Sequence, residues 1–217
     1  MRFTRFLLPA LLSAACLFTL PASAQEAAKE KVILDTDMVE LFDDGVAMTM
    51  LAASPKVELL GVTTLSGNSW VQAGTAAALR QLEMVGAPNV PVAMGLEYPL
   101  RSDRHAMFKT ERQLVGRGHD TWTGSFGLDK PESWQAAYKK SYGADPTLKP
   151  VDKHAVNFII DTVRAHPGEV TIAAIGPCGN LALAVLMALV SLKNDLVQNN
   201  RIRNRLLRPM FHVLINQ

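Results

Sequence analysis

The sequence contains few of the features that would stabilise a small domain covalently or attract a strongly charged partner. Only two of its 217 residues are cysteine, Cys16 and Cys178, so a disulfide framework is excluded. The formal net charge is only +2, which offers no electrostatic basis for binding nucleic acid or acidic membranes. Aromatic residues make up just 6% of the chain. We therefore expect a domain stabilised by a hydrophobic core or by a bound metal.

The N-terminus carries an uncharged apolar run from residue 6 to residue 20, preceded by two arginines. The small-residue segment Ala22-Ser23-Ala24 follows it, and this order is typical of a secretory signal peptide. The run is too short to predict a stable membrane span. We expect residues 1–24 to be a signal peptide cleaved before Gln25, and the mature protein to be exported, periplasmic or secreted. Cleavage would bring the formal charge to zero.

Apolar segments of strand type alternate with segments of helical periodicity from residue 31 onwards. Strands are expected at 31–36, 57–65, 90–93 and 169–175, and helices at 43–54, 70–85, 151–166 and 181–192. Alternation at this spacing favours right-handed βαβ units. The prediction is an α/β fold with an open, mostly parallel Rossmann-like sheet and helices on both faces.

The chain divides into three regions of different composition. Residues 25–192 are expected to form one α/β domain, interrupted at 96–149 by a segment of weak periodicity that is typical of a functional or mobile loop. Residues 193–217 form an atypical basic tail in which no further strand and helix are expected. The sheet is therefore predicted to be incomplete at its C-terminal end.

Four aspartates follow the first expected strand within ten positions, namely Asp35, Asp37, Asp43 and Asp44. Carboxylates this close repel one another and resist losing water unless a cation or shared protons compensate. Hard divalent ions such as Ca²⁺ or Mg²⁺ are the usual partners of a cluster of oxygens. A helix N-cap accounts for one or two of the four. The cluster therefore predicts an acidic functional site.

Polar residues also follow two later strands, at Gly67-Asn68 and at 176–180. In open α/β sheets, ligands bind beyond the carboxyl ends of the strands, so these segments are expected to meet in one pocket. There Asp37 and Asp44 would bind the cation, and a backbone carbonyl near Ile175 would add a ligand. Asp37 would also activate a water molecule.

The acidic segment and three later segments together resemble the inosine-uridine preferring nucleoside hydrolases. The matching segments are Asp35-Thr36-Asp37 with 43–47, 60–64 with Gly67-Asn68, 154–160, and 174–177 with 180–184. The resemblance covers about residues 31 to 187. It implies hydrolysis of the N-glycosidic bond of ribonucleosides, with a tightly bound Ca²⁺.

By this resemblance, Asp37 would be a metal ligand and the general base. Asp44 and the Ile175 carbonyl would be further metal ligands, and Asp43 and Asn68 would bind the ribose hydroxyls. The small-molecule partner would be a nucleoside. The sequence leaves open whether the chain also forms a homo-oligomer.

The sequence departs from the family pattern in two places. Five residues, Met38 to Phe42, separate Asp37 from Asp43, where the family has three that include Pro-Gly. The family's second half supplies a Glu-Phe-Asn segment and a late His-Asp pair, and neither occurs after Leu186. The expectation is therefore a truncated or frame-shifted ending.

Two other interpretations stay open. Val32 to Asp37 also resembles the first motif of haloacid-dehalogenase-type phosphatases, in which Asp35 would be the nucleophile and Asp37 the acid and base. That family needs a later Ser or Thr, a Lys and a further acidic pair. The other interpretation is a degenerate ribosyl-binding fragment without activity. Under the nucleoside hydrolase interpretation, Asp35 would instead lie behind the metal ligands.

Four other residues have simpler explanations than a role in a site. Trp122 and Trp134 could stack on a nucleobase, and His119 could approach a leaving group, but packing and solvation of the long segment explain them more simply. Cys178 follows Pro177 at a turn from strand to helix. With no base near it in the sequence, it is expected to be an inert packed thiol.

Overall fold

The computed structural model describes residues 28–40, 42–101, 110, 113–114, 129–198 and 212–215. Five strands form one sheet in the order β3-β2-β1-β4-β5, and every neighbouring pair is parallel. The strands are β1 (Glu30–Thr36), β2 (Val57–Thr64), β3 (Val92–Met94), β4 (Val170–Ala174) and β5 (His212–Ile215). The helices are α1 (Asp43–Ala53), α2 (Val71–Met84), α4 (Trp134–Tyr142), α5 (Ala155–Ala165) and α6 (Gly179–Gln198). The expected signal peptide lies outside the described residues.

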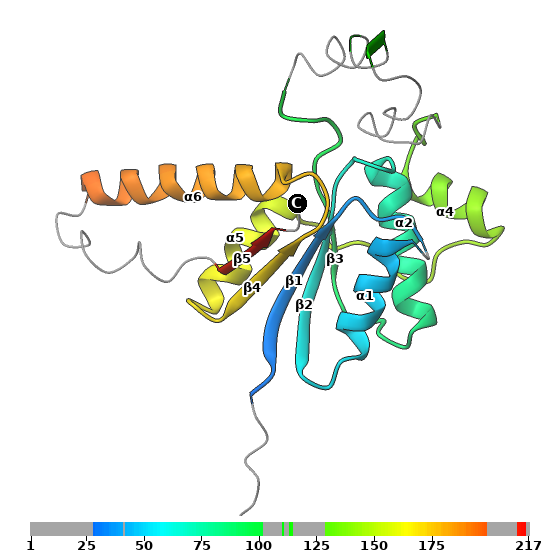
Figure 1. The fold of residues 1–217 in the computed structure, drawn as a ribbon, viewed down its shortest axis with the longest axis horizontal. Helices are drawn as coiled ribbons and strands as arrows, with labels where there is room; N and C mark the ends of the chain where they lie inside the picture. The colour runs from blue at the N-terminus through cyan, green and yellow to red at the C-terminus, as the bar shows by residue number, and fades with distance from the viewer. Residues whose placement is uncertain are drawn as a thin grey trace, which may run out of the picture.

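Helices cover both faces of the sheet, as the sequence predicted. Figure 1 shows α5 and α6 on one side and α1, α2 and α4 on the other. Successive side chains of a strand point to opposite faces. Ile33 accordingly packs into the cluster beneath α5 and α6, while Leu34 packs into the cluster beneath α1 and α2. A strand covered in this way must be apolar on both faces, which explains the continuous apolar run of β1.

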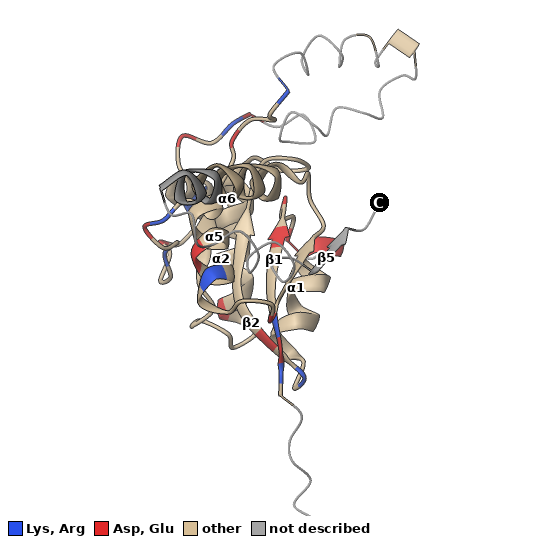
Figure 2. Cartoon of the chain, turned by 90° about the vertical axis from the view of Figure 1, so that its left-hand side faces the viewer, with Lys and Arg blue, Asp and Glu red and all other residues tan. Residues whose placement is uncertain are grey.

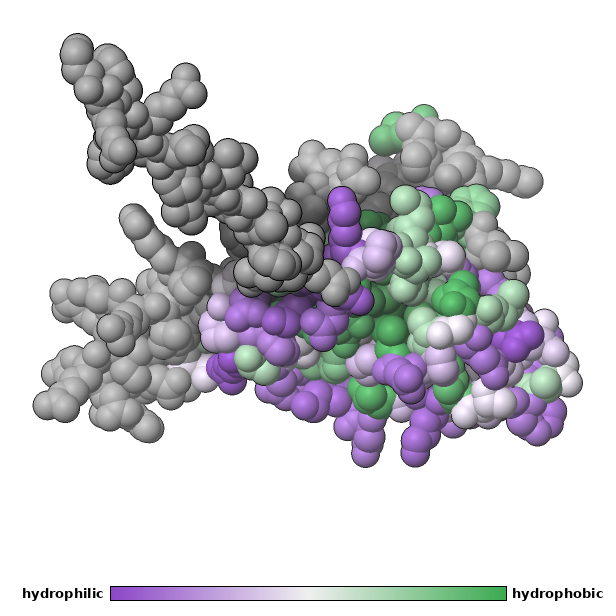
Figure 3. Space-filling model, turned by 90° about the horizontal axis from the view of Figure 1, so that it is seen from below, coloured by the Kyte–Doolittle hydropathy of each residue, from purple (hydrophilic) through white to green (hydrophobic). Residues whose placement is uncertain are grey.

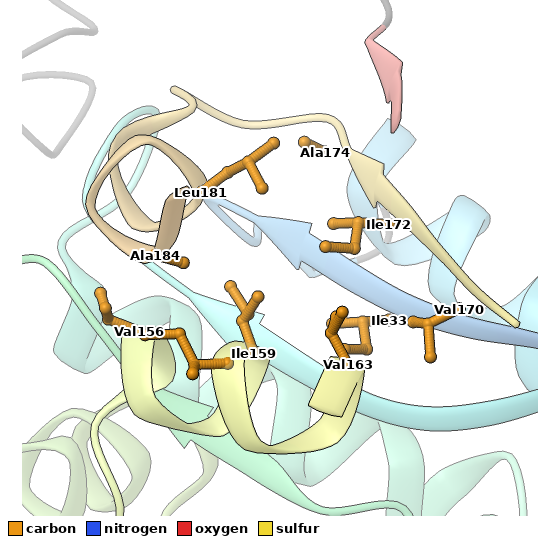
Figure 4. Packing of buried hydrophobic residues seen from close by; sticks show 10 residues of the cluster. Ile33, Val156, Ile159, Val163, Val170, Ile172, Ala174, Leu181 and Ala184 are labelled. Carbon is orange, nitrogen blue, oxygen red and sulfur yellow. The ribbon is translucent and has the colours of Figure 1, made fainter. Parts of the chain in front are cut away.

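The core on the α5 side results from a regular helical stripe. Val156, Ile159 and Val163 recur every three or four residues on α5 and point towards Ile33 and Ile172 of the sheet (Figure 4). Burial of each such side chain contributes about 1.5–3 kcal/mol. This stripe therefore attaches α5 firmly to the two strands whose ends carry the polar segments.

Two elements differ from the sequence-based expectation. The strand β5 pairs in parallel with β4, so the sheet continues into the tail, where no further unit of strand, glycine and helix was expected. Its four residues are too short to show a periodic pattern, and pairing with β4 supplies the regularity that the sequence lacks. The helix α4 lies within the segment expected to be irregular. Ser133 caps it by accepting a hydrogen bond from the Ala136 N–H, a local start signal that the weak periodicity obscured.

The order of the strands reverses between β1 and β4. The chain runs outwards from β1 to β2 and β3, and then returns to place β4 on the other side of β1. The carboxyl ends of β1 and β4 therefore flank the point in the strand order at which open α/β sheets bind ligands. The Asp35-Thr36-Asp37 segment and the Ile175-Gly176 segment lie at these two ends.

The described surface mixes hydrophilic and apolar residues (Figure 3). Large apolar side chains are exposed on α1, including Val46 and Met50, and on α6, including Leu189 and Val190. In the described part of the chain, no helix is both long enough and apolar enough to cross a membrane.

Candidate active site

Asp35 is a fully buried carboxylate near the end of β1. Its Oδ1 accepts hydrogen bonds from Thr63 Oγ1 at 2.6 Å and from Asn180 Nδ2 at 2.8 Å. Its Oδ2 has no hydrogen-bond partner among the described residues. Burial, with a smaller contribution from the nearby charge of Asp37, raises the pKa of Asp35 to about 6. The protein thus places a carboxylate here at a clear cost in desolvation.

Asp37 lies just beyond β1 and is only 5% exposed. Its Oδ2 accepts a hydrogen bond from the Asn68 backbone N–H at 2.6 Å. Two glycines make room for it, since a Cβ on Gly67 would lie 2.1 Å from Asp37 Oδ2 and one on Gly176 would lie 2.7 Å from the Asp37 nitrogen. The loops after β2 and β4 therefore both close on Asp37. Burial, and secondarily the charge of Asp43, raises its pKa.

Asp44 lies in the first turn of α1, where the helix dipole favours a negative charge. It is 3% exposed, and Thr36 Oγ1 donates a hydrogen bond to its Oδ1. Burial and the charges of Asp37 and Asp43 raise the pKa of Asp44 to about 6. Asp43, by contrast, is exposed at the start of the same helix. Of this adjacent pair, one carboxylate therefore faces the protein interior and the other faces solvent.

The structure brings the expected site segments together. Asp37 interacts electrostatically with both Asp35 and Asp44, and Figure 2 shows acidic positions in red where β1 ends. The Ile175 N–H donates to the Asp35 carbonyl at 2.9 Å, which places the end of β4 beside the acidic segment. Asn68 is half-buried next to Asp37. The predicted meeting of the three strand ends is thus observed, while the individual chemical roles stay predictions.

Asn180 organises this region in a way that the sequence analysis missed. It is fully buried at the start of α6. Its Nδ2 donates to Asp35 Oδ1 at 2.8 Å and to the Thr64 carbonyl at 3.1 Å, and its Oδ1 accepts from the Leu96 N–H at 3.0 Å. One side chain thereby joins the ends of β1 and β2 to the segment after β3. An amide directly before the apolar run 181–190 was the available signal.

The acidic residues suit a hard cation in chemistry but supply only part of a coordination shell. None of the ion pairs between described residues involves Asp35, Asp37 or Asp44. No described Lys or Arg therefore neutralises these three carboxylates through an ion pair. Within the described ranges, however, no three His, Cys, Asp or Glu side chains gather as a metal-holding group. Calcium takes about six to eight oxygens. The pair Asp37 and Asp44 therefore fits calcium only if other oxygens complete its shell.

The structure describes two of the four secondary candidates, Trp134 and Cys178. Trp134 packs against the core cluster that contains Leu34 and Met48. Burial raises the pKa of the Cys178 thiol, as expected of an inert packed cysteine. His119 and Trp122 lie outside the described residues.

Known proteins match most of this chain. Uridine nucleosidase 1 from Arabidopsis thaliana is 37% identical over 156 residues, which cover 72% of this chain and 40% of that protein. The pyrimidine-specific ribonucleoside hydrolase RihB from Escherichia coli is 32% identical, covering 73% of this chain and 43% of that protein. This chain thus spans less than half the length of these relatives.

Solved structures agree with the sequence comparison. A plant nucleoside hydrolase, the PpNRh1 enzyme, superposes with a TM-score of 0.53 at 29% identity over 73% of this chain and 43% of that chain. A purine-preferring ribonucleoside hydrolase from Gardnerella vaginalis superposes with a TM-score of 0.51 at 27% identity, over 73% of this chain and 44% of that chain. The family described as inosine-uridine preferring nucleoside hydrolase matches residues 32–195. This protein belongs to the inosine-uridine preferring nucleoside hydrolase family.

Proposed function

We propose that this chain carries the catalytic acidic site of a Ca²⁺-dependent nucleoside N-ribohydrolase. The observation that supports the proposal most is the burial of Asp37 and Asp44, which interact electrostatically, beyond the carboxyl end of β1. Two desolvated carboxylates of one sign are costly in a folded protein unless a ligand offsets their charge. Family membership indicates a nucleoside as the substrate.

Each acidic residue has a distinct part in the proposed reaction. Asp37 accepts the proton of the attacking water, for which its raised pKa is favourable. The exposed carboxylate of Asp43 and the side chain of Asn68 bind the ribose hydroxyls. Departure of the nucleobase leaves positive charge on the sugar, and the carboxylates beside it stabilise that charge.

Asp37, Asp44 and the carbonyl of Ile175 are the proposed protein ligands of the calcium ion. Calcium, when bound, supplies the positive charge that offsets the crowded carboxylates and attracts water and hydroxyl oxygens. Asp35 is proposed to act from behind this set, since Thr63 and Asn180 occupy its Oδ1. Water and the substrate are the proposed sources of the remaining ligands.

The structure gives no additional support to the phosphatase interpretation or to the ribosyl-binding interpretation. A phosphatase of the haloacid-dehalogenase type needs its second acidic pair after a later strand, whereas Asp43 and Asp44 begin the helix directly after β1. A ribosyl-binding protein without activity would use the same pocket, so only measured turnover distinguishes it from a hydrolase.

The test is hydrolysis of uridine and inosine by the full chain, with calcium and after treatment with a chelator. We expect turnover that the chelator abolishes and added calcium restores. Substitution Asp37→Asn is expected to lower kcat by about 10²–10⁴-fold, the usual contribution of a general base. The control Asp145→Asn changes an exposed carboxylate and should leave turnover unchanged. Calcium binding without any hydrolysis would favour the ribosyl-binding alternative and would contradict the proposal.

We also propose that the protein is exported and loses residues 1–24. The support is the order of charged, apolar and small residues at the N-terminus.

A further inference from the structure

The loop between Asp37 and Asp43 makes a side-chain contact with a distant helix. Tyr142, the last residue of α4, donates a hydrogen bond from its hydroxyl to Glu40 Oε2 at 2.6 Å. Glu40 lies in the middle of this loop, and the two residues are 102 positions apart in sequence. The contact therefore joins the loop between the acidic residues to α4, a helix that supplies no other residue to the site.

The loop needs such an anchor because its sequence restricts it little. It contains neither Pro nor Gly, so nothing in its composition presets a tight turn. Its first residue, Met38, is buried, and the Met38 carbonyl accepts a hydrogen bond from Ser69 Oγ at 2.8 Å. At the other end, the Phe42 carbonyl accepts from the Val46 N–H at 2.8 Å as α1 begins. Glu40 lies between these two attachments.

Tyr142 is held firmly enough to serve as that anchor. Its ring makes an edge contact with Tyr138, with centroids 4.8 Å apart, and the Arg80 guanidinium lies 6.0 Å from the centroid of the Tyr142 ring. Arg80 is in turn paired with Glu83 at 3.1 Å. The Arg80 contact joins α2 to α4, which lies beside it in Figure 1, and Ala76 of α2 packs in one cluster with Tyr138 of α4. Burial and the Glu40 carboxylate also raise the pKa of Tyr142 far above its usual value, so the hydroxyl stays a donor.

We propose that Tyr142 is a positioning residue, which through Glu40 sets where Asp43 and Asp44 lie relative to Asp37. A hydrogen bond to a charged group is among the stronger ones in proteins. The bond between Tyr142 and Glu40 restricts the loop to one arrangement before any ligand binds. Ordering of the loop then costs less free energy when a ligand binds. The consequence for calcium and substrate rests on the proposed function, whereas the consequence for the loop does not.

The test compares two tyrosines of the same helix. Tyr142→Phe removes the hydroxyl that reaches Glu40 and keeps the ring. Tyr138→Phe is the matched control, because the Tyr138 hydroxyl lies 3.5 Å from Glu83 and does not contact the loop. In the full chain, calorimetric titration with calcium should show about tenfold weaker binding for Tyr142→Phe, the magnitude expected for a charge-assisted hydrogen bond. Tyr138→Phe should bind calcium as the unmodified chain does.

A double-mutant cycle shows whether Tyr142 acts through Glu40. Glu40→Ala should weaken calcium binding as much as Tyr142→Phe does, and the double variant should bind no more weakly than either single variant. A loss in the double variant equal to both single losses together would overturn the proposal.

Hydrogen exchange without calcium provides a measurement that does not depend on the proposed function. Amides of residues 38–40 and 42 should exchange about tenfold faster in Tyr142→Phe than in the unmodified chain, and should be unchanged in Tyr138→Phe. Unchanged exchange in Tyr142→Phe overturns the inference. The inference is also overturned if the unmodified chain binds calcium and Tyr142→Phe exchanges faster but binds calcium with the same affinity. An unmodified chain that neither binds calcium nor hydrolyses nucleosides overturns the proposed function instead, and the exchange result still decides the role of Tyr142.

Discussion

The charge state of the buried aspartates matters most at the scale of the single residue. Asp35 and Asp44 both have a pKa raised to about 6, chiefly because burial disfavours the charged form. In the unfolded chain these groups ionise near pH 4. Between about pH 4 and pH 6, these groups are mostly ionised in the unfolded chain but still mostly protonated in the folded protein. The free energy of unfolding of the metal-free protein therefore falls as pH rises through this range. Above pH 6 the cost is fully present.

We therefore predict that removing one of these charges stabilises the metal-free protein at neutral pH. Asp35→Asn should raise the free energy of unfolding at pH 7.5 by about 1–3 kcal/mol, as expected for a buried acid with a raised pKa. At about pH 3 the gain should disappear, since Asp35 is then largely protonated in both states. Urea denaturation with chelator present measures this, and Asp145→Asn is the exposed control. An equal gain at both pH values would contradict the assignment of the effect to charge.

At the scale of the element, the site depends on how closely two loops approach the end of β1. Gly67 after β2 and Gly176 after β4 both lie against Asp37, with no room for a Cβ. The strands themselves are placed by apolar packing beneath α2 and α5. The position of Asp37 is thus a consequence of backbone contact between parallel strands.

We predict that Gly67→Ala displaces Asp37 or its loop and impairs the site. A Cβ there would lie 2.1 Å from Asp37 Oδ2, a contact that no real structure tolerates. Calcium affinity, measured by calorimetry, should fall by at least about tenfold, as is usual when groups that orient metal ligands are lost. The control is Gly86→Ala, at the end of α2. Gly86 has a φ of 75° and open space around it, so the substitution should cost about 1 kcal/mol of stability and leave calcium affinity unchanged. Similar calcium affinities in both variants would contradict this account of the loop.

At the scale of the whole molecule, the described α/β core corresponds to less than half of each relative's length. Within that core the strand order reverses between β1 and β4, and Asp35 and Asp37 lie at the carboxyl end of β1. The apolar exposed side chains of α6 and the edge position of β5 are further features of this core.

The prediction at this scale concerns the mature protein. When the full chain is expressed in an exporting bacterial host, N-terminal sequencing of the processed protein should begin at Gln25. Substitution Ala24→Phe should block processing, because cleavage requires a small residue at that position. The conservative control Ala24→Ser should still be processed. A protein that retains residues 1–24 after export would contradict the prediction of a cleaved signal peptide.

Much of the fold was predictable because it depends on local pattern. The strand at 31–36 and the helix at 43–54 appear in the structure as Glu30–Thr36 and Asp43–Ala53, since apolar periodicity and turn residues act over short ranges. The helix α4 and the strand β5 were not predicted. The first is only nine residues long and the second only four, so each depends on tertiary packing or pairing for its regularity.

By itself, the sequence determined that this chain forms alternating strands and helices and that crowded aspartates follow the first strand. Both properties belong to residues close together in the chain. Only the tertiary structure decided that Asp44 is buried while Asp43 is exposed, that Asn180 binds Asp35, and that Tyr142 contacts Glu40. Each of these features depends on which segments lie side by side in the folded protein. Strand order and core packing decide that, and no local sequence pattern encodes it.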